Sequence, residues 1–120
     1  MKKIFFILLI SSIVIAAEPA VKKYHLGKQE FAVSEVQPGV WMSVGCKSTC
    51  LALQALSKAS TKDLPKMPKH GGRNPGAALC KYSAKGKVFI AYDENRNQQS
   101  FCRFTDNSYT TSGSFLAVKK

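Results

Sequence analysis

The sequence predicts a small single domain of the α+β class, with antiparallel strands and two short-to-medium helices, stabilised by disulfide bonds. Several short segments are rich in the β-branched and aromatic residues that strands favour. Two other segments are rich in small or straight-chain residues and carry helix start or stop signals. The 120 residues include four cysteines, namely Cys46, Cys50, Cys80 and Cys102. A chain of this length has room for one domain, and small domains are often stabilised by crosslinks.

The first 17 residues have the organisation of a secretory signal peptide. A basic start is followed by an apolar run over residues 4–15 and by the small residues Ala16 and Ala17. The run is shorter than the roughly 20 apolar residues that a membrane-spanning helix needs, although a retained N-terminal anchor is the alternative interpretation. We therefore expect a secreted or periplasmic protein with no transmembrane segment after cleavage.

The next segment is expected to be a flexible arm followed by a β-hairpin. Residues 18–30 are polar and lack hydrophobic periodicity. Two apolar runs, Phe31–Val36 and Val40–Val44, flank a Pro-Gly pair that fits a type II turn. The single tryptophan, Trp41, lies in the second run and is expected to anchor the core because it buries a large area.

A helix is predicted over residues 46–60, where alanine and leucine dominate and apolar residues recur at three- and four-residue steps. Ser48 or Thr49 could cap it. Prolines and glycines then prevent helix continuation in residues 61–73, which we interpret as a basic linker. Its cations are candidate contacts for an anionic partner, and a solvated linker without a partner is the alternative; they are Lys62, Lys66, Lys69 and Arg73.

Residues 74–118 are expected to form a short helix packed on a sheet. Asn74 is a favoured N-cap residue, and Pro75 suits the first helical position. The glycine-rich stretch before them could instead hold an anion at the helix start, but helix entry is the favoured interpretation. Residues 87–92 and 100–104 read as strands joined by a polar loop, and residues 114–118 as a last strand or extended arm.

The even cysteine count in an exported chain predicts two disulfide bonds. Zinc ligation is the rival interpretation, but the sequence has neither C-x-x-C spacing nor a paired histidine motif. The formal net charge is +11, and loss of Lys2 and Lys3 with the leader lowers the basic count from 18 to 16 against 7 acidic residues. Such a balance attracts anionic partners and also keeps a small protein soluble.

One pattern in the second half resembles a known family. Asn74-Pro75 is followed by Cys80 and then by a C-x-F-x-D-x-S segment made of Cys102, Phe104, Asp106 and Ser108. This is similar to a small exported bacterial domain of unknown function that is often labelled putative haemolysin. The similarity covers about residues 72–118. The Glu-Trp pair and the further cysteines that usually follow in that family are absent here, where Tyr109, Thr110 and Thr111 stand.

The resemblance implies a Cys80–Cys102 disulfide and no assigned catalytic residue. Cys46 and Cys50 then remain for the second bond. Within a regular helix, residues four apart hold their Cβ atoms about 5–6 Å apart, whereas a disulfide needs about 3.8 Å. Either the helix starts after Cys46, or these two cysteines pair with Cys80 and Cys102.

The leading functional hypothesis is an exported, non-catalytic module that binds an anionic or protein partner at the cell envelope. We expect no cofactor, no metal and no catalytic residue. A small secreted nuclease is one alternative, with His25 and His70 as acid and base and a lysine or Arg73 stabilising the transition state. A membrane-active, haemolysin-like protein is another. An inhibitor of a protease or lysozyme is a variant of the binding hypothesis.

Overall fold

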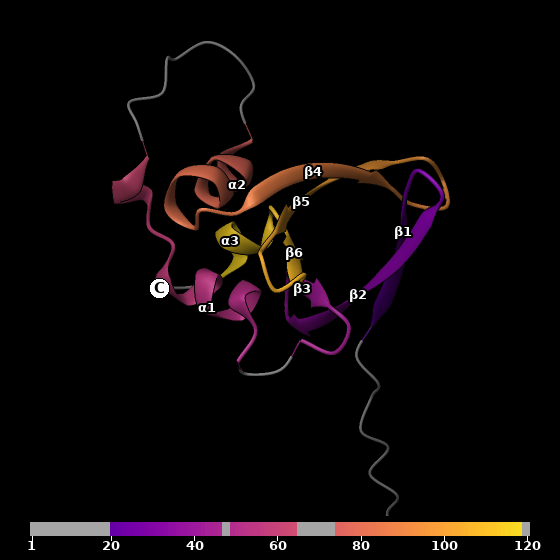
Figure 1. Cartoon of the computed structure of the whole chain (residues 1–120), viewed down its shortest axis with the longest axis horizontal. Coiled ribbons are helices and arrows are strands. Elements are labelled where there is room, and N and C mark those ends of the chain that lie inside the picture. Colours follow the sequence, from indigo (N-terminus) through magenta and orange to yellow (C-terminus); the bar gives the residue numbers. More distant parts are fainter. Residues whose placement is uncertain (1–19, 47–48, 65–73, 119–120) are drawn as a thin grey trace, which may run out of the picture.

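The computed structural model describes residues 20–46, 49–64 and 74–118, and its main feature is a closed antiparallel barrel of six strands. The strand order around the barrel is β1-β2-β3-β6-β5-β4, and β4 returns to β1. Short helices gather on one side of it (Figure 1). The predicted α+β class is therefore wrong, because the strands close on themselves into a mostly β structure and the helices are small additions.

The first three strands form a meander. β1 (Val21–Leu26), β2 (Gln29–Gln37) and β3 (Val40–Ser43) pair in sequence order. The β2–β3 hairpin confirms the prediction for this segment, and Gly39 has the positive φ of 78° that a type II turn requires. The prediction of a flexible arm over residues 18–30 is wrong for the residues that the structure describes. These residues contribute β1 and the start of β2, because β1 pairs along its whole length with β2.

The last three strands form a second meander made of β4 (Lys87–Tyr92), β5 (Gln98–Arg103) and β6 (Tyr109–Thr111). β4 and β5 match the predicted strands, whereas β6 was not predicted. The two meanders join at two seams, each with one residue pair: Met42 with Thr110 between β3 and β6, and His25 with Tyr92 between β1 and β4. These two seams turn two three-stranded sheets into one barrel.

Within residues 20–46, 49–64 and 74–118, five short helical segments connect or follow the strands. α1 (Leu51–Lys58) and η1 (Thr61–Asp63) follow β3. α2 (Pro75–Ala78) continues into η2 (Leu79–Ser83), a π-helical turn, before β4. The last segment, α3 (Ser114–Ala117), replaces the strand or arm predicted at residues 114–118.

Two contacts hold this final segment against the rest of the domain. The hydroxyl of Ser114 accepts a hydrogen bond from the backbone N–H of Trp41 at 2.9 Å, which ties the start of α3 to β3. Phe115 is buried in the core beneath the helices. The short helix thus places Phe115 in that core while the Ser114 hydroxyl holds its first turn against β3.

The strand alternation creates two separate cores. The barrel interior is aromatic, with Tyr24, Val33, Ala91 and Phe101 buried and Phe31, Trp41, Phe89 and Tyr109 packed against them. The second core lies between the outer wall of the barrel and the helices; its buried members are Val40, Met42, Ala52, Leu56, Ala59, Leu79, Cys80, Cys102 and Phe115. On β5, Phe101 faces the first core and Cys102 the second, as the two-residue strand period requires.

Candidate functional site

The residues proposed from the sequence as anion contacts do not form a described site. Lys62 is exposed in η1. Lys66, Lys69 and Arg73 lie outside the described residues. His70 lies there too, and His25 pairs with Tyr92 on the wall of the barrel. The structure therefore brings together neither the predicted basic cluster nor the two histidines of the nuclease hypothesis within its described part.

The Asn-Pro segment is the start of a helix. The Oδ1 atom of Asn74 accepts hydrogen bonds from the backbone N–H groups of Gly76 at 2.9 Å and Ala77 at 3.3 Å. Pro75 occupies the first helical turn, where its missing N–H is not needed. These N–H groups are satisfied by the cap, which confirms the helix-entry interpretation.

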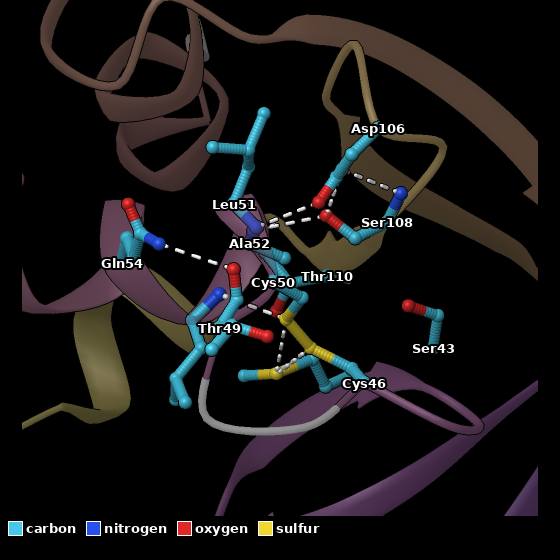
Figure 2. The surroundings of a disulfide bond; sticks show 12 residues. Ser43, Cys46, Thr49, Cys50, Leu51, Ala52, Gln54, Asp106, Ser108 and Thr110 are labelled. Carbon is cyan, nitrogen blue, oxygen red and sulfur yellow. Dashed lines mark hydrogen bonds between the residues drawn. A yellow bond between two sulfur atoms is a disulfide. The ribbon is translucent and has the colours of Figure 1, made fainter.

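The Asp-x-Ser segment of the family-like pattern also has a structural role (Figure 2). The Asp106 carboxylate accepts from the Leu51 N–H at 2.8 Å, and the Ser108 hydroxyl accepts from the Ala52 N–H at 3.0 Å. The Ser108 hydroxyl also donates to Asp106. The loop after β5 thus supplies capping groups to the first turn of α1, whose N–H groups have no partner inside the helix.

The prediction of two disulfide bonds is confirmed. Cys80 pairs with Cys102, the connectivity that the family resemblance implies, and both are fully buried. Cys46 pairs with Cys50, and both are half-buried. α1 starts at Leu51, after both cysteines, so the alternative in which the helix starts after Cys46 and the two cysteines pair with each other is confirmed. The cap is Cys50 rather than Ser48 or Thr49, since its sulfur accepts from the Leu53 N–H at 3.4 Å.

A hollow lies at one mouth of the barrel, where β1, β5 and the starts of β2, β4 and β6 meet. It has a volume of about 440 Å³, within the range of 300–1,000 Å³ that is usual for small-ligand sites. Its apolar walls are Leu26 from β1, Phe31 from β2, Phe89 from β4 and Tyr109 from β6. We call this hollow, together with Arg103 and Asn107 at its rim, the barrel mouth.

The aromatic walls of the barrel mouth are held by their neighbours in the core. The ring of Phe31 meets the rings of Tyr109 and Phe101 edge to face, at centroid distances of 5.0 and 5.2 Å. Phe89 stacks on Phe101 at 5.3 Å. Because Phe31, Phe89 and Tyr109 are only half-buried, part of each ring faces the hollow. The hollow is thus a preformed apolar surface, whose aromatic side chains are held in place by contacts with the buried side chain of Phe101.

The rim of the barrel mouth carries a positive charge. The exposed Arg103 donates from Nη2 to the Oδ1 of Asn107 at 2.9 Å, which orients its guanidinium. Glu30 also lines the hollow, but its carboxylate is 3.7 Å from the Nζ of Lys23, and this is the one ion pair within the described residues. The Arg103 guanidinium therefore retains donors for a ligand.

The apolar walls and the Arg103 charge have opposite effects on the pKa of the Tyr109 phenol. Burial raises the pKa of Tyr109, and the nearby Arg103 charge lowers it by a smaller amount. Its hydroxyl donates to the Ala32 carbonyl oxygen at 3.1 Å. Tyr109 is thus a neutral, positioned wall of the hollow at neutral pH.

The barrel mouth was not predicted from the sequence. Its apolar walls come from four strands and its rim arginine from a fifth, and only barrel closure brings them together. The available signal was local: Arg103 lies between Cys102 and Phe104, a basic residue in an otherwise apolar strand end. Trp41, predicted as a core anchor, is half-buried and packs against the barrel interior, with the Nζ of Lys22 4.5 Å from its ring centre.

Two further features bear on the predicted classes of function. No group of three or more histidine, cysteine, aspartate or glutamate side chains is arranged to hold a metal ion among the residues that the structure describes. None of the described helices is long and apolar enough to cross a membrane. Comparisons with models of known families, with curated proteins and with solved structures gave no match.

Proposed function

We propose that the protein is an exported, non-catalytic binding module, secreted or periplasmic, which takes an anionic ligand with an apolar part into the barrel mouth. The observation that carries this proposal is the combination of half-buried aromatic walls and one oriented guanidinium at the rim. The leader-like first 17 residues support export, and the two disulfide bonds suit an oxidising compartment.

The geometry divides the ligand into two parts. An aromatic or aliphatic group of the ligand would cover the exposed parts of Phe31, Phe89 and Tyr109, and apolar burial would supply most of the affinity. A carboxylate, sulfonate or phosphate would accept hydrogen bonds from Arg103, for which guanidinium groups have a suitable planar donor geometry. The excess of basic over acidic residues would attract such a ligand over a longer range.

The proposal is tested by titrating the oxidised protein with 1-anilinonaphthalene-8-sulfonate, an anionic aromatic probe whose fluorescence rises in apolar surroundings. We expect saturable binding that weakens with added salt, since the Arg103 contact is exposed and screened. Arg103→Gln should weaken binding about tenfold, which corresponds to about 1.4 kcal/mol.

The matched control is Arg96→Gln, which removes the same charge from the exposed loop between β4 and β5. It should leave the dissociation constant within about twofold of the wild type. Equal weakening by both substitutions would mean that the probe senses only the overall charge, and the proposal would be wrong. Near-ultraviolet circular dichroism of each variant checks that the fold is retained.

A further inference from the structure

The edge of β4 that faces β1 is open along most of its length. All six residues of β4 pair with β5. On the other side, the only pair with β1 among the described residues is Tyr92 with His25. Within the part of the chain that the structure describes, the backbone N–H and C=O groups of every second residue in 87–91, namely those that do not bond to β5, therefore have no strand partner. Proteins usually cover or block such an edge, because it is a template for another strand.

The barrel mouth lies beside this open edge. Phe89, in the middle of the unpaired part of β4, and Leu26, at the end of β1, both line the hollow. A strand added to β4 would therefore run along the opening of the barrel mouth. Every second side chain of that strand would point into the hollow, since strand residues alternate between faces.

The charges around this edge favour an acidic partner. Lys87 lies directly opposite Arg103 in the β4–β5 pairing, and the two-residue period puts Lys87 on the same inward face as Phe89. Like charges directly opposite each other are unfavourable, and neither residue has an ion-pair partner among the described residues. A second copy of this chain would bring further positive charge to the same place, given a formal net charge of +11.

We infer that the ligand of the barrel mouth is an extended acidic polypeptide segment that adds to β4 as a further strand. This inference rests on the proposed function and names the ligand class. The peptide backbone pairs with residues 87–91. One apolar side chain enters the hollow beside Phe89, and an acidic side chain two residues away meets Lys87 and Arg103. The predicted recognition pattern is an apolar and an acidic residue separated by one position.

The test uses a capped seven-residue peptide, Thr-Glu-Thr-Phe-Thr-Glu-Thr, which reads the same in both directions. It therefore presents the same side chains to β4 in a parallel or an antiparallel arrangement. Binding to the oxidised protein is followed by two-dimensional amide nuclear magnetic resonance and by hydrogen exchange. We expect at least tenfold slower exchange at alternate amides within residues 87–91, namely those that do not bond to β5.

N-methylated peptides show whether the backbone makes the contact. One control is methylated at the phenylalanine and both glutamates, and the other at the four threonines. In an added strand only one of these two sets points its N–H groups at β4, so one methylated peptide should bind at least tenfold more weakly and the other nearly normally. Equal binding of both, or saturation without protection of β4, would overturn the inference.

Charge controls complete the experiment and separate it from the test of the proposed function. A peptide with lysine in place of glutamate, and the Arg103→Gln protein, should each lower affinity, whereas Arg96→Gln should not. If the naphthalene probe binds in an Arg103-dependent way but no peptide protects β4, the proposed function stands and the peptide inference is wrong. If the probe does not bind at the barrel mouth, the proposed function itself is wrong. A dimer formed through β4 would also overturn the inference.

Discussion

The carboxylate of Asp106 accepts a hydrogen bond from the backbone N–H of Leu51 at 2.8 Å, across a separation of 55 residues in the chain. Asp106 lies between β5 and β6, and Leu51 is the first residue of α1. The contact therefore joins the helix of the first half to the sheet of the second half, next to the Cys46–Cys50 disulfide (Figure 2). It gives the Asp-x-Ser segment a role in assembling the domain.

Ser108→Ala should destabilise the protein by about 1 kcal/mol. The buried hydroxyl of Ser108 accepts from the Ala52 N–H, and its loss would leave that donor without a partner at the helix start. Urea unfolding measures the change. Ser57→Ala is the matched control, because its exposed hydroxyl bonds only to a carbonyl within the same helix. A similar loss for both variants would contradict the capping role.

Acid should weaken the fold partly through Asp106. Hydrogen bonds from the Leu51 N–H and from Ser108 lower the pKa of Asp106 below its ordinary value. Because the folded-state pKa is lower than the unfolded one, this contribution is present above the unfolded value of about 3.9 and is lost as pH falls through the folded pKa. The free energy of unfolding should therefore fall as the pH drops below about 5.

Asp106→Asn should flatten that part of the pH dependence, measured by urea unfolding at intervals of half a pH unit. A residual slope is expected, since the backbone N–H of Asn97 similarly lowers the pKa of Asp93. An unchanged slope in Asp106→Asn would contradict the prediction.

Gly76→Ala should destabilise the domain by about 2 kcal/mol, although alanine is the better helix former. A Cβ atom at Gly76 would overlap the backbone carbonyl of Ser112, where α2 crosses the turn before α3. Thermal unfolding followed by circular dichroism measures the effect. Gly113→Ala is the control: its Cβ would meet no atom within 4 Å, and its φ of −63° suits alanine. A stabilised Gly76→Ala variant would show that the crossing is looser than described.

Removal of the buried disulfide should cost more than removal of the half-buried one. Cys80 and Cys102 are 22 positions apart, against 4 for the other pair. The chain-entropy estimate is about 3 kcal/mol for the longer loop and about 2 kcal/mol for the shorter. The double alanine variants, compared by urea unfolding, test this order. The difference in destabilisation between the two variants should exceed the difference of about 1 kcal/mol that chain entropy alone predicts. The reason is that Cys80 and Cys102 also fill the core between barrel and helices. A reversed order would contradict the assignment.

The sequence predicted correctly those elements that are determined by turn, capping or strand-forming residues within the element itself. The Pro-Gly turn set the β2–β3 hairpin, and Asn74 with Pro75 set the start of α2. β4 and β5 were recognisable from their β-branched and aromatic residues. In each case the chemistry that forms the element lies within a few neighbouring residues.

The missed elements depend on partners far along the chain. In β1 only Tyr24 is buried, so its sequence shows no strand-like alternation, and its partner β2 supplies the pairing. β6 has three residues and lies between β3 and β5. In α3, Ser114 bonds to Trp41 of β3 and Phe115 fills the core between barrel and helices. These contacts join residues that are too far apart in the chain for a local sequence pattern to predict them.

By itself, the sequence determined the basic composition and the local hairpin and cap signals, and it predicted the disulfide bonds that the structure confirms. Only the tertiary structure decided that the strands close into a barrel and that Phe31, Phe89, Arg103 and Tyr109 meet at its mouth. The physical reason is that closure depends on two seams of one residue pair each, between segments that lie 67 and 68 positions apart, His25 with Tyr92 and Met42 with Thr110. Such pairings are selected by the packing of the whole domain and not by the propensity of either strand.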